Sequence, residues 1–595
     1  MGRTILKAII TLIYVFGFNT SLKSQQETPY IINGIGQERI FIHYNAPLFF
    51  VGEYLYYRVY CLNSNTNNLS DISKIAYVRL IGEDGNTIFS QKVALENGLG
   101  QGDFFIPVAV PSGNYKLIGF TRWMRNWEQE QFYEGDITII NPYSNDQKPF
   151  LGDDDMDSIP TKKNDAQDGF TKSGKAINFK NGNVTLSVPK KVYGKREKVA
   201  LSLSASNERL ALGNYSLSVR KIDDFSTVKS ETAHEFIQKT KGIPAKPPTG
   251  DRGFLPELRG TLVRGQLKSM DATRSLKGIP VALSIPGKEY LLQIAKTSET
   301  GAFYFNLNDS KDKGYAFLQV LGKKNKTFQI EIKEDSTILD HKRLSFGSFK
   351  LDKSLDSIIL KRSIHNQIEN AFFKAKPDTL ASKLGTPAFY GTMGSTFKLD
   401  DFTRFPTLRE TVVEIIDNVW IEEKDNSDFC FKIRSPYESE MDDDFNSLLI
   451  VDGLPVQNQK DFLKYDSRRI ESIHVVRGVY RLGAHFFHGI FDVKTFDSDY
   501  LSKVDLSIYN RMEFLNVLPN KRYFRQFYSE ETQDEKEQIP DLRYQLLWLP
   551  DVKMGTQEKY IDFFTSDVSG DFEISLEGFT ANGTPVSAKK VFSVN

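Results

Sequence analysis

The feature that most constrains this chain is a strict alternation of apolar and polar residues between positions 38 and 142. It runs through "ERIFIHY", "EYLYYRVYCL", "KIAYVRLIGEDGNTIFSQKVAL", "GDFFIPVAV" and "GNYKLIGFTRW". A period of two residues is typical of β-strands with one buried face. The Asp84-Gly85 pair stands where a tight hairpin needs it, and no helical period interrupts the pattern. The sequence therefore predicts an antiparallel sandwich here.

Composition extends this interpretation to the whole chain. Aromatic residues make up 12% of the 595 residues, with 44 Phe and 26 Tyr, as suits many half-buried strands. The length suggests about four domains. Basic and acidic residues balance at 76 each, which argues against a nucleic-acid-binding protein.

The first 24 residues have the pattern of a signal peptide. Arg3 and Lys7 precede an apolar run from Ala8 to Phe18, which is too short to span a membrane as a helix. We therefore expect an exported protein that resides in the periplasm. Cys61 and Cys430 are too few for a disulfide framework, and two buried free thiols are expected.

Two segments resemble macroglobulin-like sandwiches. "YLYYRVYCLN", "IAYVRLIGEDGNTIFSQKV" and "GQGDFFIPVAVPSGNYKLIGFTRW" carry the resemblance for residues 25–142. "GNVTLSVPKKVYGKREKVALSLSASNERLALGNYSLSVRKIDDF" carries it for a second sandwich-like segment, 176–226. The polar, turn-rich stretches 143–175 and 227–253 are interpreted as linkers.

Two further β segments follow. "LPELRGTLVRGQLKSMDATRSLKGIPVALSIPGKEYLLQIAKTSETGAFYFNL" is similar to the transthyretin-like, carboxypeptidase-regulatory-like module, assigned to 254–362. That resemblance implies a structural appendage without catalytic residues. The end of the chain, 501–595, alternates again in "FFTSDVSGDFEISLEGF" and is interpreted as a sandwich-like segment. Residues upstream of 363 can complete this C-terminal sandwich. In that case the region 363–500 between the two parts is an insertion.

The remaining segment, 363–500, mixes helices and strands. "FPTLRETVVEIIDNVWIEE" predicts a helix whose capping box is Thr407 and Glu410. Leu408, Val412, Ile415, Ile416 and Val419 fall on one face of that helix. It precedes "SLLIVDGLPVQNQKDFLKYDSRRIESIHVVRGVYRLGAHFFHGIFDVKTF", 447–496. The order helix, strand with a "DG" turn, helix, strand and strand resembles the plug domain of TonB-dependent receptors. The matching motif residues are Asp452, Gly453, Arg477, Gly478, Gly483 and Gly489.

The predicted fold class is therefore mostly β and multidomain, with macroglobulin- or immunoglobulin-like antiparallel sandwiches and a small α+β plug-like domain. Arg468, Arg469, Tyr480 and Arg481 are the candidate partner contacts, because arginine and aromatic residues are enriched at interface hot spots.

Enzymatic chemistry is not expected. The sequence has no G-x-S-x-G elbow, phosphate-binding loop or dinucleotide fingerprint. His485 and His488 point to opposite faces if they lie in a strand, so they would not share a metal ion. The carboxylate-rich stretches 423–428 and 439–444 have no apolar wall beside them. No catalytic residue, cofactor or metal is predicted.

A plug domain of this kind normally precedes a β-barrel in the same chain. About 100 residues follow Phe496, whereas roughly 200 are needed for some 22 strands of 9–11 residues. We therefore expect the plug-like domain to fill the barrel of another outer-membrane protein, to which it attaches peripherally. The combination resembles the soluble plug proteins of the type 9 secretion translocon. Two alternatives stay open: an accessory binding subunit of a SusC-like TonB-dependent nutrient transporter, and a structural envelope protein.

Overall fold

The computed structural model describes residues 35–144 and 184–595, apart from short gaps. The gaps are 223–224, 226–228, 242–252, 272, 308–313, 323–326, 334–338, 348, 352–354, 382–387, 425–427, 437–444, 505, 529–538 and 556. The expected signal peptide and most of the linker 143–175 lie outside the described residues.

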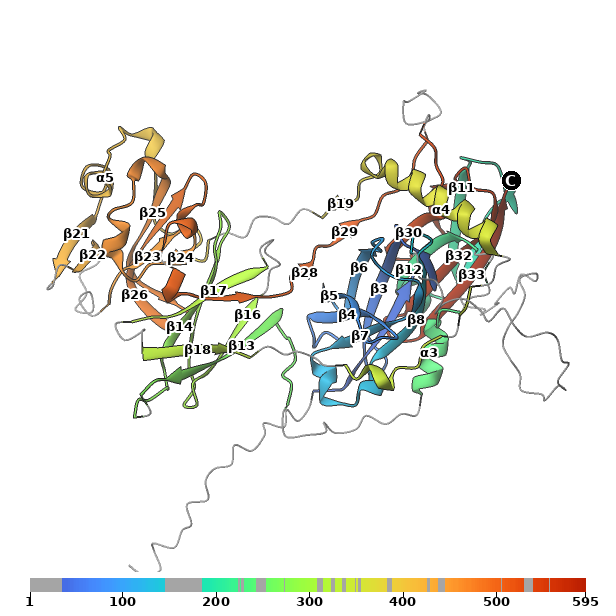
Figure 1. Cartoon of the computed structure of the whole chain (residues 1–595), viewed down its shortest axis with the longest axis horizontal. Coiled ribbons are helices and arrows are strands. Elements are labelled where there is room, and N and C mark those ends of the chain that lie inside the picture. Colours follow the sequence, from blue (N-terminus) through green and yellow to red (C-terminus); the bar gives the residue numbers. More distant parts are fainter. Residues whose placement is uncertain are drawn as a thin grey trace, which may run out of the picture.

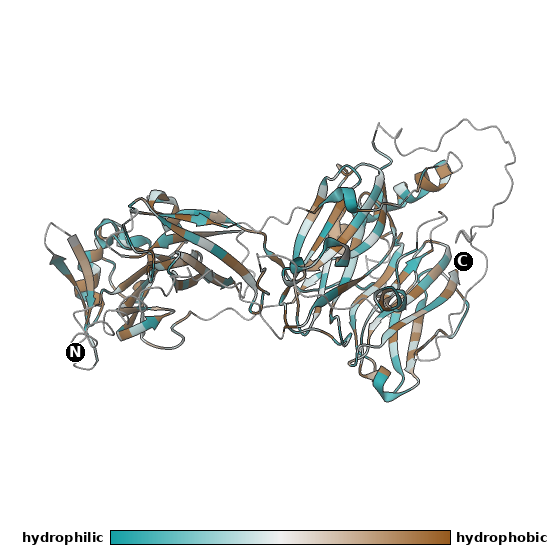
Figure 2. Cartoon of the chain, turned by 90° about the horizontal axis from the view of Figure 1, so that it is seen from below, coloured by the Kyte–Doolittle hydropathy of each residue, from teal (hydrophilic) through white to brown (hydrophobic). Residues whose placement is uncertain are grey.

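The fold is mostly β and multidomain, as the sequence predicts. Figure 1 shows two groups of sheets joined by extended segments. One group contains two sandwiches, and the other contains a third sandwich and the plug-like domain. Along the strands of both groups apolar and polar residues alternate (Figure 2), which places the apolar side chains between the sheets.

The first sandwich is built from the residues with the strict alternation. Its strands are β1 Glu38–Tyr44, β2 Leu48–Phe50, β3 Tyr54–Asn63, β4 Ile75–Gly82, β5 Thr87–Ala94, β6 Leu99–Phe105, β7 Gly113–Thr121 and β8 Tyr133–Ile140. They form a sheet β1-β3-β6 and a sheet β2-β8-β7-β4-β5. Asp84-Gly85 connects β4 and β5, and Gly85 has the positive φ of 82° that such a turn requires.

The second sandwich is assembled from the two sequence segments 176–226 and 501–595, so residues upstream of 363 do complete the C-terminal sandwich, and the region between them is an insertion. Its strands are β9 Val184–Ser187, β10 Val192–Tyr193, β11 Lys198–Ala205, β12 Asn214–Lys221, β30 Gln545–Val552, β31 Lys559–Phe564, β32 Gly570–Phe579 and β33 Pro585–Val594. They form the sheets β10-β33-β32-β12-β30 and β31-β11-β9. Each half contributes strands to both sheets, so neither could close a core alone. We call this unit the split sandwich; the chain between its halves is an insertion.

The third sandwich, called the middle sandwich, takes one strand from beyond the plug-like domain. Its strands are β13 Thr261–Ser269, β14 Pro280–Ile285, β15 Leu291–Lys296, β16 Ala302–Leu307, β17 Tyr315–Val320, β18 Phe328–Ile332 and β27 Asn510–Glu513. After β27 the chain adds β28 Val517–Leu518 in parallel to β5 of the first sandwich. Then β29 Lys521–Arg522 pairs with β19 Thr379–Leu380. Residues 510–522 therefore connect the two groups of sheets.

The plug-like domain contains a mixed sheet in the order β20-β25-β26-β23-β24 and a hairpin β21-β22. Its elements are β20 Ser395–Lys398, α5 Leu408–Ile415, β21 Val419–Lys424, β22 Asp428–Ile433, β23 Leu448–Val451, β24 Leu454–Pro455, α6 Gln459–Phe462, β25 Ile470–Leu482 and β26 His485–Thr495. The capping box of Thr407 and Glu410 starts α5 as predicted. However, α5 ends at Ile415 because Asn418 turns the chain with a φ of 63°, and Val419 begins a strand instead of extending the helix.

Two helices depart from the predicted domain boundaries. Helix α3, Ala233–Thr240, lies in the predicted linker 227–253 and packs on the first and split sandwiches through Phe236, whose ring centroid is 5.4 Å from that of Phe41. Helix α4, Asp356–Ala371, was expected to belong partly to the plug-like domain. It lies instead against the first sandwich, where Arg362 Nε donates to Glu53 Oε1 at 2.8 Å.

Both cysteines are buried thiols that form no disulfide in the described part of the chain, as predicted. In the part of the chain that the structure describes, no helix combines the length and the apolar character needed to cross a membrane.

Candidate functional site

The predicted "DG" turn of the plug-like domain joins β23 to β24. Asp452 has a φ of 49° and Gly453 a φ of 88°, and positive values at both central residues define a type I′ hairpin turn. The Asp452 carboxylate accepts hydrogen bonds from Thr495 N at 2.8 Å, Thr495 Oγ1 at 2.7 Å and Tyr500 N at 3.3 Å. This buried aspartate therefore holds the turn against the end of β26, a role that the sequence pattern alone did not reveal.

The three glycines predicted from the motif occupy special backbone positions in the β25–β26 hairpin. Gly478, with a φ of 84°, lies at the register shift between Val476 and Val479. Gly483 follows Leu482 in the turn that connects the two strands, and a Cβ there would lie 2.1 Å from Ile294 O. At Gly489 an added Cβ would lie 2.8 Å from Val476 O. All three have positive φ values, and Gly483 and Gly489 also have close backbone neighbours, which explains why the motif has glycine here.

The candidate contact residues do not form one patch. Arg468 and Arg469 lie just before β25, whereas Tyr480 and Arg481 lie near its far end. At about 3.3 Å per residue the two pairs are roughly 40 Å apart along the strand. The two pairs therefore lie toward opposite ends of β25, and their role as partner contacts stays a prediction.

Each of these residues also has a partner within the chain. Arg468 pairs with Asp466 at 2.9 Å, and Arg469 pairs with Asp499, while both side chains remain exposed. Tyr480 donates its hydroxyl hydrogen to Phe389 O at 2.9 Å and is only partly exposed. Arg481 Nε donates to Gly483 O at 3.1 Å. The motif residue Arg477 is exposed, and its Nε donates to Arg434 O at 2.9 Å.

A buried aspartate joins the plug-like domain to the middle sandwich. Asp492 on β26 is 1% exposed. Its Oδ2 accepts from the Tyr290 hydroxyl at 2.7 Å and from the Tyr390 hydroxyl at 2.6 Å. Burial raises the pKa of Asp492, although both tyrosine hydroxyls favour its charged form. Tyr290 belongs to the β14–β15 connection of the middle sandwich, so the two units share one polar cluster.

Apolar side chains surround this cluster. Residues from β14, β15, β23, β25 and β26, with one residue after β17 and one before β20, form one buried core, which comprises Ala282, Leu292, Ile294, Leu321, Tyr390, Leu448, Ile450, Val476, Phe487 and Ile490. The plug-like domain is therefore packed on the middle sandwich through a shared core. Sequence reasoning missed this interface, because no local pattern connects Tyr290 to a residue some 200 positions later.

Gly453→Val is expected to loosen both the turn and this interface. A side chain at φ 88° is strained by about 1–3 kcal/mol. In addition, its Cβ would lie 2.2 Å from Tyr290 Cβ. Limited proteolysis should therefore cut the variant faster within 400–500 than wild type.

Gly278→Val provides the control for Gly453→Val. Gly278 has a φ of 74°, but an added Cβ would meet nothing within 4 Å. This variant should keep wild-type protection in 400–500. Equal protection of Gly453→Val would contradict the prediction.

The structure shows no grouping typical of metal chemistry in the residues it describes: no three His, Cys, Asp or Glu residues could hold an ion together. His485 and His488 both lie on β26, His485 partly exposed and His488 buried. The acidic stretch 439–444 lies outside the described residues, as do 425–427 of the other stretch.

Comparisons with known proteins add little beyond the fold class. No protein-family model matches the chain, and no curated protein matches it. Among solved structures, a Salmonella α-2-macroglobulin variant matches with 10% identity and a TM-score of 0.23, over 94% of this chain and 40% of that one. Native Escherichia coli α-2-macroglobulin matches with 10% identity and a TM-score of 0.22, over 95% of this chain and 40% of that one.

Dimeric latent PorU from Porphyromonas gingivalis matches with 8% identity and a TM-score of 0.15, over 50% of this chain and 34% of that one. The chain spans about two fifths of the length of the α-2-macroglobulins that it matches. Scores this low carry no argument about function, and the mostly β, multidomain architecture is what the structure and these neighbours have in common.

Proposed function

We propose that this chain is a non-enzymatic periplasmic plug, which occludes the periplasmic end of a large outer-membrane barrel, that of the type 9 protein-secretion translocon. The observation that carries the proposal is the plug-like domain itself. Its strand with a type I′ "DG" turn, short helix and long β25–β26 hairpin are folded together as one compact unit. A barrel of about 22 strands has a lumen wide enough to hold a plug of this kind.

The position of the domain also supports this proposal. It lies at one end of the molecule, and the first and split sandwiches lie at the other (Figure 1). The core shared with the middle sandwich fixes its orientation. The domain can therefore meet a barrel mouth while the other sandwiches remain outside.

The exposed charges suit a reversible seal. Arg468 and Arg469 are exposed at the start of β25, each beside an aspartate. Rim charges of this type affect association rate and specificity more than they affect affinity. A seal that must open for cargo needs such a polar, releasable contact in preference to a large apolar one.

Deleting the gene in its natural host is expected to make the cells more sensitive to vancomycin, because an unsealed pore admits a large antibiotic. The wild-type gene should restore resistance, as should the Gly278→Val gene, whereas Gly453→Val should restore it only partly. Unchanged sensitivity of the deletion strain, with the partner barrel present in normal amount, would overturn the proposal.

Pull-down from detergent-solubilised outer membranes identifies the barrel. Recovery of the secretion translocon is the expected result. Recovery of a SusC-like transporter with its lipoprotein would support an accessory transport subunit instead, and recovery of no barrel would support a structural envelope protein.

A further inference from the structure

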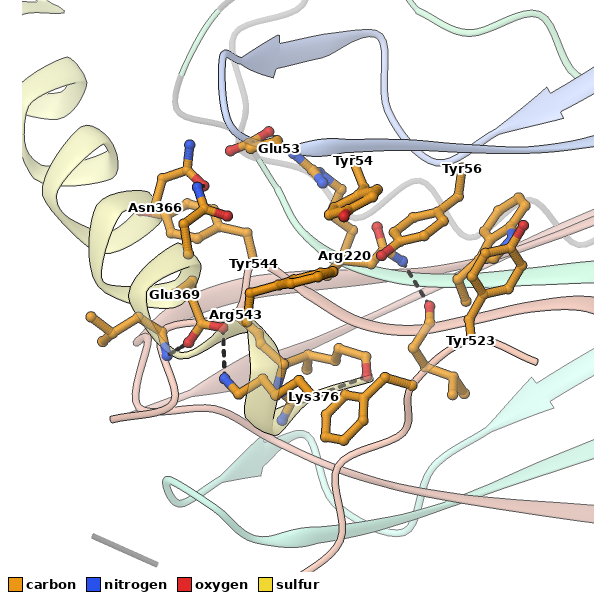
Figure 3. Close-up of a pocket in the computed structure, with 18 of the residues that line it drawn as sticks. Glu53, Tyr54, Tyr56, Arg220, Asn366, Glu369, Lys376, Tyr523, Arg543 and Tyr544 are labelled. Carbon is orange, nitrogen blue, oxygen red and sulfur yellow. Dashed lines mark hydrogen bonds and ion pairs between the residues drawn. The ribbon is translucent and has the colours of Figure 1, made fainter. Parts of the chain in front are cut away.

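Helix α4 packs on the sandwiches through one of its sides. Asn366 Nδ2 donates to Val51 O at 2.6 Å, and Asn370 Nδ2 donates to Gly52 O at 3.0 Å. Figure 3 shows Asn366 and Glu369 extending from α4 toward the sandwiches, beside a pocket of about 160 Å³. These three side chains mark the inner side of the helix. The helix lies at the end of the molecule remote from the plug-like domain (Figure 1), so its surface plays no part in the function proposed above.

The outer side of α4 carries an apolar stripe that is open to solvent. Leu360 is 63% exposed, Ile364 46% and Phe372, just after the helix, 37%. Ile368 is half-buried and Ala371 is exposed. At roughly 100° per residue these five positions fall within an arc of about 80°. We call them the α4 stripe. The outer side of a surface helix is ordinarily polar, so an apolar stripe of this width marks a face that something covers.

The chain enters the segment 145–183, which lies outside the described residues, from one edge of the α4 stripe. The Tyr143 hydroxyl lies 2.8 Å from Ser363 Oγ and accepts from Gln367 Nε2 at 2.8 Å. At roughly 100° per residue, Ser363 and Gln367 lie along one flank of the stripe and Lys361 lies along the other. Lys361 is exposed. A chain that leaves Tyr143 and crosses the stripe therefore arrives at a lysine.

The first apolar residues of this segment match the α4 stripe in chemistry and in reach. Phe150 and Leu151 follow Ser144 by six and seven residues. Six extended residues span roughly 20 Å. Along α4, at about 1.5 Å per residue, Gln367 is only about 10 Å from Leu360. Phe150 and Leu151 can therefore reach every part of the stripe.

The charges that follow are complementary to the far flank of the stripe. Directly beyond Leu151 and a glycine the sequence has an acidic run, Asp153, Asp154, Asp155 and Asp157. Lys361 stands on the side of the stripe opposite to Tyr143. The order in the segment, apolar pair and then acidic run, is thus the order in which a crossing chain meets the apolar stripe and then the lysine.

We propose that Phe150 and Leu151 dock on the α4 stripe, with the acidic run 153–157 beside Lys361. A second copy of the chain and a lipid surface are the other occupants for such a stripe. The chain's own segment is favoured over both, because Tyr143 already fixes its attachment point beside the stripe. A short tether gives an effective concentration in the millimolar range, and a separate partner also loses translational and rotational freedom on binding.

Cysteine cross-linking of the purified protein tests this proposal. The variant Leu151→Cys/Ile364→Cys should form a disulfide within one chain under mild oxidation with copper phenanthroline. The two native cysteines are buried and do not compete. Adding Phe150→Ser should slow disulfide formation roughly tenfold, because the tether keeps its length while a docked apolar side chain is lost.

Phe170→Ser provides the matched control, because Phe170 belongs to the same segment but lies well beyond the acidic run. In the Leu151→Cys/Ile364→Cys protein it should leave the cross-linking rate unchanged. Lys361→Gln should slow the reaction about twofold at low salt and have no effect at 0.5 M salt, where the charges are screened. Hydrogen exchange of β3 and β12 shows that each variant is folded.

Three results would overturn the proposal. One is a rate that Phe150→Ser and Phe170→Ser change equally, or no disulfide at all. Another is a disulfide-linked dimer in place of the bridge within one chain, which would assign the stripe to a second copy. The third is binding of the protein to phosphatidylethanolamine–phosphatidylglycerol vesicles that Ile364→Ser abolishes, which would assign the stripe to a lipid surface.

Discussion

Replacing Arg362 with methionine is expected to release helix α4 from the sandwiches, at a cost of about 3–5 kcal/mol. The Arg362 side chain is 2% exposed. Its Nε and Nη2 donate to the two oxygens of Glu53 at 2.8 and 2.9 Å, and its guanidinium group lies 4.5 Å from the centroid of the Phe50 ring. Methionine keeps most of the packing but leaves Glu53 buried with a single cationic partner, Arg220.

The pH dependence of this contact has a definite sign. Burial alone would raise the pKa of Glu53, but Arg362 and Arg220 together hold it at about 2. The stabilisation is therefore fully present above the ordinary value of 4.5 and is lost as the pH falls through about 2. In Arg362→Met we expect the loss to begin at higher pH.

Hydrogen exchange of the α4 amides, residues 356–371, measures the effect of Arg362→Met. Exchange should be much faster in this variant than in wild type. Lys361→Met is the matched control, because Lys361 is the exposed neighbour on the same helix. Equal protection of α4 in the two variants would show that the buried ion pair does not hold the helix.

Glu577→Gln is expected to stabilise the protein by about 3 kcal/mol at pH 8 and by little at pH 4. Glu577 on β32 is 3% exposed. Its Oε2 accepts from Ala233 N at 2.9 Å, at the start of α3, and from Ser587 Oγ at 2.6 Å. Burial raises the pKa of Glu577 to about 7; Lys589 opposes this shift and Glu235 adds to it.

Because the folded state holds this proton more tightly than the unfolded chain, the free energy of unfolding falls as the pH rises from the ordinary value of 4.5 to about 7. The difference between an ordinary pKa of 4.5 and a pKa of about 7 corresponds to roughly 3 kcal/mol. Glutamine cannot ionise, so the variant should lack this part of the pH dependence.

Urea unfolding across pH 4–8 measures the difference between wild type and Glu577→Gln. Glu573→Gln is the control on the same strand, since Glu573 is partly exposed and pairs with Lys589 at 2.9 Å. If the free energies of unfolding of wild type and Glu577→Gln differed by the same amount at every pH, the pH dependence would not come from Glu577.

Local signals in the sequence predicted local structure well. The alternation between 38 and 142 gave the strands of the first sandwich, and the "DG" pair gave the turn at Asp452. The capping box of Thr407 placed the start of α5, but the apolar spacing extended that helix too far. Val419 was predicted to be buried as part of the helix. It is buried instead as the first residue of β21, in the same core as the apolar face of α5.

Contacts between residues far apart in the sequence could not be predicted from such local signals. Helix α3 has its own capping box, Thr232 with Glu235, which could have been found but was hidden in a segment interpreted as a linker. The pairing of β12 with β30 and β32, and the contact of Tyr290 with Asp492, depend on residues hundreds of positions apart. Alternation shows that a strand has a buried face, but it does not show which strand covers that face.

The split sandwich has a consequence for how this protein is made. Strand β12 is central in its sheet, yet both of its neighbours, β30 and β32, come from the last part of the chain; Gln545 Nε2, for example, donates to Val219 O across 326 residues. Contacts of such long range form slowly. Until residues 545–594 arrive, β11 and β12 have unpaired edges that can join with other chains. The nascent protein therefore has a long period in which aggregation competes with folding, and we expect it to need protection by a chaperone during that time.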